Sequence, residues 1–389
     1  MTGTATGVTS PSGFVASGVA SGIKASAARD LALVATDDGR PVAAAAVFTT
    51  NKATAGPVNV TRAHLAATRG RAAAVVVNSG CANAATGARG DADAERMCEL
   101  VAAGLGCELA EVLVCSTGLI GYYLPMPAVE KGVPPLVAAR HPGGGADAAL
   151  AMMTTDTVPK EVVVAGDGYV VGGMAKGAAM LAPDMATMLA VLTTDAVAEP
   201  DELLAHLRAA VADSFNALVV DGCTSTNDTV IVLANGRSGR PLERAVLTRA
   251  CAELAHMMAA DAEGATKLAR IRVHGAASDA DARRAARKVA ESQLVQCSLF
   301  GADPYWGRIL SELGSSGAAF DPLLVSVSYG PVEVCRDGIA ADHDEAAVAE
   351  HMAGRDVVIT ADLGLGDGRA AMLFTDLTPG YIDENMRTS

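Results

Sequence analysis

The chain has 389 residues, half of them hydrophobic, with 40 glycines, only 3% aromatic residues and a formal net charge of −14. A chain of this length can bury a large core in one big or two interlocked lobes, packed here by small aliphatic side chains. The negative charge argues against nucleic acid and anionic membrane surfaces as partners, because both attract clustered lysine and arginine.

The eight cysteines are scattered, with no Cys-x-x-Cys pair and no histidine at ligand spacing. This pattern favours reduced, buried thiols over disulfides or a metal centre, and we expect neither a cofactor nor a metal. The first residues, MTGTATGV, lack a basic region followed by an apolar stretch, and no apolar run approaches the ~20 residues that span a bilayer. We therefore expect a cytoplasmic protein that does not contact membranes.

Strands and helices alternate in the first half of the chain. Apolar runs predict strands and helical spacing predicts one helix; the strands are 31–35, 43–48, 73–77 and 112–115, and the helix is 91–104. Segment 126–139 is predicted to be at best a helix interrupted at Gly132-Val-Pro-Pro135, because proline breaks the backbone ladder. A loop at 140–145 follows, and then a hairpin of 161–165 with 169–172 around a Gly-Asp-Gly turn.

The second half of the chain continues this mixture. The run after Thr187, Met-Leu-Ala-Val-Leu, has helical character, and helices are predicted at 199–214 and 241–260, with a charged, solvated helix at 279–291. Strands are predicted at 230–234, 269–274, 323–329 and 356–361. Mixed elements with many hairpin signals favour an α+β layered fold over a doubly wound parallel sheet.

The most specific chemistry lies in the segment KGAAMLAPDMATML, which runs from Lys176 to Leu189. A threonine hydroxyl is a weak nucleophile at neutral pH, and a free α-amino group on the same residue can activate it as a general base. Self-cleavage between Ala186 and Thr187 would create that amine. The plainer interpretation is that Thr187 helps to start a helix, since threonine is common near helix N-termini.

Other motifs follow in order along nearly the whole chain: NSGCANAATG at 78–87, STGLIG at 116–121, MTTDT at 153–157, TSTNDT at 224–229, EGATK at 263–267, GADPYWGR at 301–308 and DLTPGY at 376–381. With the threonine segment they resemble the ornithine acetyltransferases, the bifunctional glutamate N-acetyltransferase family of arginine biosynthesis. The resemblance implies a layered αββα-type sandwich of paired sheets covered by helices. It also implies an α chain, 1–186, interlocked with a β chain, 187–389.

The resemblance assigns roles to individual residues. Thr187 would be the nucleophile, and Thr117 with Gly118 would hold the developing oxyanion through a hydroxyl and a backbone N–H. The implied substrate contacts are Thr154, Lys176, Thr187, Glu263, Asn385 and Ser389. A lysine suits a substrate carboxylate and a glutamate suits a substrate amine. Taken alone, Thr117 is an ordinary turn residue, Lys176 a surface lysine and Glu263 a helix-end residue.

The expected reaction transfers an acetyl group from N2-acetylornithine to L-glutamate through an acetyl-Thr187 intermediate, in an α2β2 heterotetramer of self-cleaved chains. Alternatives are an N-terminal-nucleophile amidase or aminopeptidase that uses water as the acceptor, an acetyltransferase of a specialised pathway, and an unprocessed binding protein. The acidic background leaves anchoring of amino acids to single cations such as Lys176 or Lys267. The sequence leaves open whether acetyl-coenzyme A is a second donor and whether Thr388 or Ser389 makes the last contact.

Overall fold

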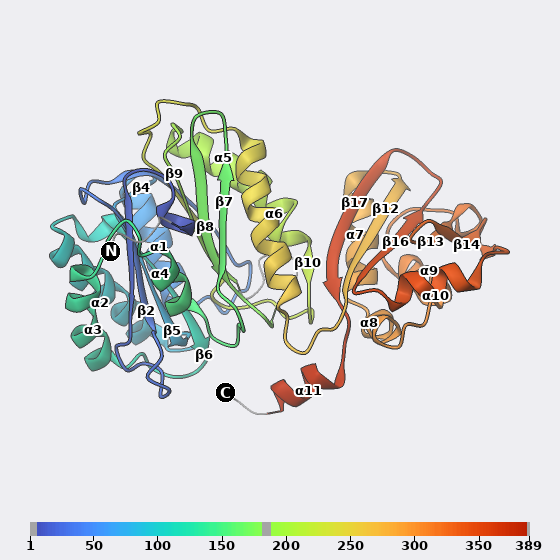
Figure 1. The fold of residues 1–389 in the computed structure, drawn as a ribbon, viewed down its shortest axis with the longest axis horizontal. Helices are drawn as coiled ribbons and strands as arrows, with labels where there is room; N and C mark the ends of the chain where they lie inside the picture. Colours follow the sequence, from blue (N-terminus) through green and yellow to red (C-terminus); the bar gives the residue numbers. More distant parts are fainter. Residues whose placement is uncertain (1–5, 181–187, 387–389) are drawn as a thin grey trace.

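The computed structural model describes residues 6–180 and 188–386, which form three β-sheets with helices packed on them (Figure 1). The sheets have the strand orders β1-β2-β5-β6, β4-β3-β11-β9-β8-β7 and β10-β17-β12-β16-β13-β14-β15. The first two sheets face each other and carry helices on their outer faces. The predicted α+β class and the αββα sandwich are thereby confirmed.

The first sheet lies entirely in the first half of the chain. Its strands are β1 (Phe14–Val19), β2 (Leu31–Thr36), β5 (Ala74–Cys81) and β6 (Val112–Leu119). Helices α1 (Gly56–Ala67), α2 (Gly87–Leu105) and α3 (Met126–Ala138) cover its outer face. Their buried stripes, spaced at about 3.6 residues, pack on the outward-facing side chains of the strands and form one core cluster with them.

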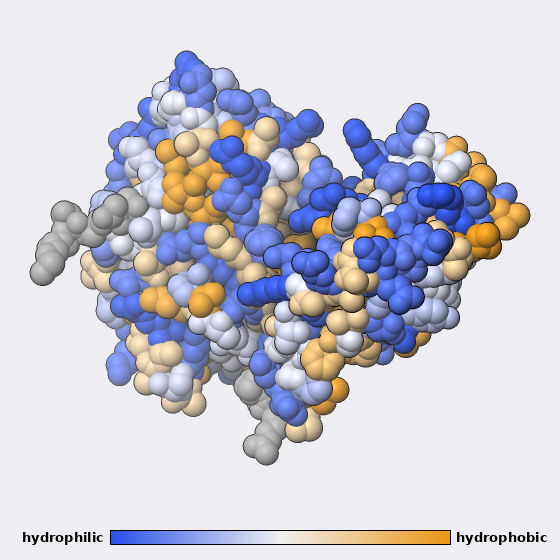
Figure 2. Space-filling model, turned by 45° about the vertical axis from the view of Figure 1, so that its right-hand side comes forward, coloured by the Kyte–Doolittle hydropathy of each residue, from blue (hydrophilic) through white to orange (hydrophobic). Residues whose placement is uncertain are grey.

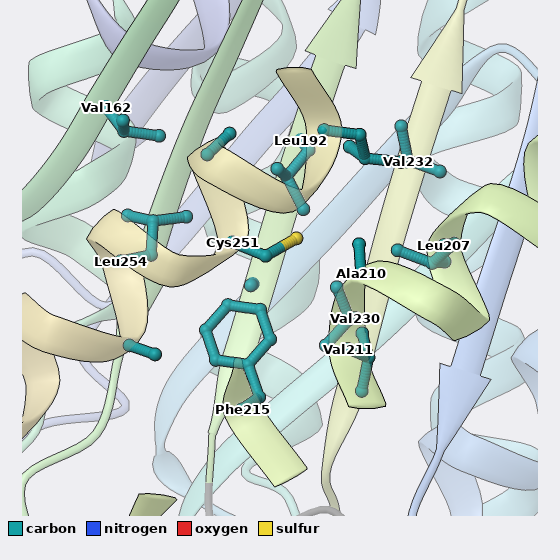
Figure 3. Close-up of a cluster of buried hydrophobic side chains, with 14 of the residues drawn as sticks. Val162, Leu192, Leu207, Ala210, Val211, Phe215, Val230, Val232, Cys251 and Leu254 are labelled. Carbon is teal, nitrogen blue, oxygen red and sulfur yellow. The ribbon is translucent and has the colours of Figure 1, made fainter. Parts of the chain in front are cut away.

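The second sheet is covered on its outer face by α5 (Pro200–Ala212) and α6 (Arg244–Ala260). Its strands are β3 (Val42–Phe48), β4 (Arg71–Ala72), β7 (Lys160–Ala165), β8 (Val170–Lys176), β9 (Leu189–Thr194) and β11 (Thr229–Ala234). Figure 3 shows Leu192 and Val232 of the sheet facing Leu207 of α5 and Cys251 and Leu254 of α6. This apolar layer fixes both helices on the sheet.

Small side chains fill the space between the two sheets. The inner layer contains alanines of both sheets and of the short helix α4 (Gly145–Met152), which packs between them. Alanine side chains allow the sheets to approach closely, as the aromatic-poor composition predicts.

In the second sheet, the two strands that follow residue 187, β9 and β11, lie between strands that precede it. β3 pairs antiparallel with β11, β11 pairs parallel with β9, and β9 pairs antiparallel with β8. The two portions of the chain therefore share one sheet and are interlocked, as expected.

The third sheet lies wholly after residue 187 and has its own core with α7 (Asp279–Ala290), α8 (Gln293–Phe300), α9 (Trp306–Ser315) and α10 (Glu345–Ala353). Its strands are β10 (Leu218–Val219), β12 (Leu268–Ala276), β13 (Ser326–Tyr329), β14 (Val332–Arg336), β15 (Ile339–Ala340), β16 (Asp356–Asp362) and β17 (Gly368–Thr375). Figure 2 shows the surface hollowed where this part meets the sandwich, and a pocket of about 220 Å³ lies there between α6 and β17. The last helix, α11 (Pro379–Asn385), leads back toward the sandwich (Figure 1).

Two predicted elements differ from the structure. Helix α3 continues through Pro134 and Pro135. Both prolines are exposed, and the carbonyls that lose an N–H partner belong to the exposed Glu130 and Lys131, so water can replace the missing donors. The run after Thr187 is the strand β9, buried along its whole length between β8 and β11. A continuous apolar run suits a central strand as well as a buried helix, so periodicity misassigned it.

Other boundaries differ in smaller ways. The strand predicted at 323–329 begins only at Ser326, after a 3-10 turn at Pro322–Leu324. Helix α7 is charged on one side but packs its alanines on the third sheet, so it is not fully solvated. Two of the eight cysteines, Cys223 and Cys297, are exposed, which corrects the expectation that all are buried. No helix in the described residues is long and apolar enough to cross a bilayer.

Candidate active site

Two glycines on neighbouring strands approach each other where β5 and β6 leave the core. Gly80 pairs with Gly118 in the parallel register, and Gly118 has φ = +129°. A Cβ on Gly118 would lie 2.3 Å from the carbonyl carbon of Gly80, so only glycine permits this contact. Thr117 is buried and Gly118 is exposed, so the predicted oxyanion donors lie at the point where β6 emerges from the core.

A buried amide network fastens this turn to the second sheet. Ser116 Oγ donates to Asn78 Oδ1 (2.5 Å), and Asn78 Nδ2 donates to the Cys81 carbonyl (2.8 Å). Asn227 Nδ2 donates to the carbonyls of Ser116 (2.9 Å) and Ala82 (2.6 Å). The motifs at 78–87, 116–121 and 224–229, far apart in the sequence, thus meet at one place.

Asp228 connects that network to the start of β9. Its Oδ1 accepts a hydrogen bond from the backbone N–H of Met188 (3.0 Å), the residue that follows Thr187 in the sequence. Its Oδ2 is buried and has no hydrogen-bond partner among residues 6–180 and 188–386. Burial raises the pKa of this carboxyl well above its ordinary value, against the opposing effects of the Met188 N–H and of the Lys176 ammonium. Asp228 therefore holds the first described residue after the predicted nucleophile.

Lys176 ends β8 directly across from Leu189 of β9. It is only 3% exposed, and its ammonium makes no hydrogen bond or ion pair with the described part of the chain. Burial lowers the pKa of Lys176, although the charges of Asp156, Glu263 and Asp228 work in the opposite direction. A buried lysine that no described residue engages is suited to bind an anionic ligand, and its burial shows that the alternative of a surface lysine is wrong.

A buried ion-pair network lies beside Lys176. Lys160 Nζ is 2.6 Å from Asp156 Oδ1 and 2.6 Å from Asp261 Oδ2. Asp156 also accepts hydrogen bonds from the backbone N–H groups of Gly177 (2.7 Å) and Thr154 (3.1 Å). Because both N–H groups bond the same carboxylate, the network holds Thr154 close to Gly177, which follows Lys176. Sequence reasoning assigned no role to Lys160 or Asp261, whose proximity depends on tertiary structure.

Glu263, in the connection between α6 and β12, joins the same region. Its backbone N–H donates to the Ala178 carbonyl (2.9 Å), and its Oε2 accepts from Asn385 Nδ2 (2.8 Å). Glu263 is only 8% exposed, so it is not a solvent-exposed helix-end residue. Gly264 has φ = +63° and touches the Tyr381 backbone, which lets the chain end pack here.

The structure brings several predicted site residues together: Thr154, Lys176, Glu263 and Asn385 gather around Gly177 and Ala178. Thr117 and Gly118 are linked to the start of β9 through Asn227 and Asp228. Ala186, Thr187 and Ser389 lie outside the described residues, and their roles stay predictions.

Lys267 does not join this group. Its ammonium donates to the carbonyls of Met352 (2.7 Å) and Gly354 (2.9 Å) at the end of α10, so it caps a helix of the third sheet. The expectation that it anchors a substrate is not supported by this geometry. Among residues 6–180 and 188–386, no cluster of three or more histidine, cysteine, aspartate or glutamate side chains could hold a metal ion.

The resulting arrangement combines a backbone turn that can stabilise an anion, a buried cation and a buried carboxylate. Such a set can bind a zwitterionic amino acid at both ends and stabilise the charge that develops in acyl transfer.

The comparisons with known proteins agree with this chemistry. The model of the ArgJ family matches residues 15–388. The "Arginine biosynthesis bifunctional protein ArgJ" of Thermobifida fusca is 48% identical over 97% of this chain and 98% of that protein, and its namesake of Mycobacterium tuberculosis is 50% identical over 98% and 96%. A solved structure of ornithine acetyltransferase complexed with ornithine, also from Mycobacterium tuberculosis, is 52% identical and covers 46% of this chain and 95% of that chain, with a TM-score of 0.44. The chain belongs to the ArgJ family.

Proposed function

We propose that this chain is a glutamate N-acetyltransferase of arginine biosynthesis, which moves acetyl from N2-acetylornithine to L-glutamate. The observation that carries the proposal is identity of 48–50% over 97–98% of the chain to proteins named for bifunctional arginine biosynthesis. The convergence of the buried cation Lys176 and the buried carboxylate Glu263 gives this activity a chemical basis, because both substrates are amino acids with charged ends.

Self-cleavage between Ala186 and Thr187 would generate the nucleophile. Thr187 Oγ attacks the Ala186 carbonyl carbon, the C–N bond breaks as the ester forms and frees the α-amino group, and water then hydrolyses the ester to release the Ala186 carboxylate and the Thr187 hydroxyl. The antiparallel pairing of β8 with β9 supports this step, since it holds Lys176 and Leu189, which flank the connection, side by side.

Acetyl transfer would then proceed in two stages. The Thr187 amine takes the proton from Oγ, Oγ attacks the acetyl carbonyl of N2-acetylornithine, and the Thr187 ammonium passes that proton to the α-nitrogen as the C–N bond breaks and ornithine leaves. The glutamate α-amine next attacks the acetyl ester, and the proton returns to Thr187. Thr117 and Gly118 would stabilise the oxyanion in both stages.

Thr154, Lys176, Glu263, Asn385 and Ser389 would bind the substrates. In this assignment Lys176 serves a carboxylate, while Glu263, held by Asn385, serves the δ-amine of ornithine. The reaction would take place in the cytoplasm, in a heterotetramer of two α and two β chains. A second acetyl donor such as acetyl-coenzyme A would account for the word "bifunctional" in the names of the relatives.

The test is to incubate the purified enzyme with N2-acetylornithine alone and to weigh the fragments. The fragment that begins at Thr187 should gain about 42 Da, as expected for an acetyl ester on the nucleophile. Adding glutamate should remove this mass and yield N-acetylglutamate. Release of free acetate instead would identify an amidase, and absence of the mass gain with intersecting initial-rate lines would identify direct transfer in a ternary complex.

A further inference from the structure

A rigid loop precedes the second strand and presents Lys24 to the candidate site. The carboxylate of Asp30, which is fully buried, accepts hydrogen bonds from the backbone N–H groups of Ser21 (2.6 Å), Gly22 (3.0 Å), Ile23 (2.7 Å) and Lys24 (3.0 Å). The Ser21 hydroxyl adds a further bond of 2.8 Å. Because its backbone is held at four consecutive residues, the loop places the Lys24 side chain reproducibly, as a binding residue requires.

The Lys24 side chain runs from this loop to two predicted parts of the active site. Its stem lies against Gly80, the partner of Gly118: a Cβ on Gly80 would be 3.0 Å from Lys24 Cγ. Its ammonium donates to the carbonyls of Met153 (2.7 Å) and Arg29 (2.8 Å). An ammonium has three donors, so one remains for a ligand beside the peptide that leads into Thr154.

The charges around Lys24 favour an anionic ligand. Burial lowers the pKa of Lys24, the carboxylate of Asp30 raises it, and the ammonium of Lys176 lowers it. Hydrogen bonds connect the two lysines: Lys24 bonds the Met153 carbonyl, and Asp156 bonds the N–H groups of Thr154 and of Gly177, which follow Met153 and Lys176. The nearby carboxylate of Asp156 is already bonded to Lys160 and to two backbone N–H groups. A ligand carboxylate near both ammonium groups would relieve their repulsion.

Solvent reaches this ammonium. Lys24 and Thr154 line an open pocket of about 440 Å³ together with Met153, Leu150 and Arg29. The other cation of the pocket, Arg29, forms an ion pair with Asp147 at 2.7 Å. Among the described residues, no carboxylate is bonded to the Lys24 ammonium. A small molecule can therefore enter and contact Lys24 and Thr154 together.

We propose that Lys24 binds the α-carboxylate that N2-acetylornithine and glutamate share. The inference rests on the proposed function and adds a residue to it. The α-carboxylate is assigned to Lys24 because Lys24 lines the pocket beside Thr154, whereas the buried carboxylate of Glu263, held by Asn385, suits the δ-amine of ornithine. Lys24 would thus join Lys176 in anchoring the part of the two substrates that does not change between them.

The experiment removes the charge from the enzyme and the carboxylate from the substrate in turn. Lys24→Met keeps an apolar stem against Gly80, and N-acetylputrescine is N2-acetylornithine without its α-carboxylate. Lys24→Met should lower kcat/KM for N2-acetylornithine by about 10- to 100-fold, the usual effect of losing a hydrogen bond to a charged group, and leave kcat/KM for N-acetylputrescine unchanged. Lys24→Arg should recover part of the loss, and Lys131→Met, at an exposed lysine of α3, should change neither value.

An equal loss with both substrates would overturn the proposal, because it would mean that Lys24 acts only by holding the Met153 carbonyl. Calorimetric binding of ornithine and of putrescine to wild type and Lys24→Met separates this outcome from failure of the proposed function. A wild type that binds ornithine more tightly than putrescine, with the preference abolished in the variant, supports Lys24 even if no acetyl is transferred. A preference retained in the variant refutes it.

Discussion

At Gly118 the absence of a side chain shapes the candidate site. The close approach to Gly80 and the positive φ of Gly118 let β6 turn out of the core beside β5. The hydroxyl of Thr117 and the N–H of Gly118 are then adjacent along one backbone. A fixed backbone donor costs no reorganisation during the reaction, which is the basis of oxyanion stabilisation.

Substituting Thr117 by alanine should lower kcat while KM changes little, because an oxyanion donor acts in the transition state more than in the bound substrate. We expect a loss of about 10²- to 10³-fold in kcat, measured by steady-state acetyl transfer to glutamate. Thr117→Ser keeps the hydroxyl and should keep most of the activity. A change in KM alone would mean that Thr117 binds substrate instead.

Substituting Gly118 by alanine should both destabilise the protein and abolish acetyl transfer. Gly121 is a matched control, since it also has a positive φ (+86°) but a Cβ there would meet nothing within 4 Å. Backbone strain of about 1–3 kcal/mol is common to both variants, and the contact with Gly80 adds to it only at Gly118. Urea unfolding should therefore show a larger loss for Gly118→Ala, and equal losses would contradict a role for the glycine contact.

At the scale of elements, the Asp156, Lys160 and Asp261 network joins three segments. Lys160 begins β7, Asp261 follows α6, and Asp156 bonds the backbone just beyond β8. Burial alone would raise the pKa of Asp156, but the charges of Lys176 and Lys160 and the Gly177 N–H outweigh it and lower the pKa. The ionised carboxylate therefore stabilises the fold.

This direction predicts how stability depends on pH. Because the folded-state pKa of Asp156 is below its unfolded value of about 3.9, its contribution is complete above that pH and is lost as pH falls through the folded value. Asp156→Asn should lower the free energy of unfolding by about 2 kcal/mol at pH 7. The difference from wild type should shrink below about pH 4. A difference that stays constant from pH 7 to pH 3 in urea titrations would contradict this account.

At the scale of the whole molecule, the two portions of the chain are held together by the second sheet. β8 and β9, and β3 and β11, pair across the boundary at residue 187, each over six residues. Cutting one peptide bond in the connection between β8 and β9 would remove none of these ladder hydrogen bonds. The fold therefore does not depend on the bond that self-cleavage would break.

The cleaved protein should accordingly behave as one particle until it unfolds. A denaturing gel should show two fragments, the smaller ending at Ala186 and the larger beginning with Thr-Met-Leu-Ala, while gel filtration in native buffer should give one peak. Thr187→Ala should remain a single chain and elute at the same volume. Fragments that separate without denaturant would contradict the interlocked sheet, and native mass spectrometry of the peak would show whether it contains two α and two β chains.

Local sequence determined most of the elements and the nature of the chemistry. Strands such as 31–35 and 230–234 and helices such as 199–214 were predicted because their periodicity and ends are local properties. The motifs identified the ArgJ family, and Lys176, Glu263 and Asn385, named from them, lie close together in the structure.

Tertiary structure decided what periodicity cannot express. The run after Thr187 is a strand only because β8 and β11 flank it, and α3 tolerates its prolines because they face solvent. Lys267 caps a helix although its charge looked equally suitable for a substrate. The position of Lys24 beside Gly80 and Thr154, and the pairing of Lys160 with Asp261, arise from contacts between segments distant in the chain. The sequence specifies which titratable groups are present. Folding decides how deeply each group is buried and which charges lie beside it, and these two factors set its pKa.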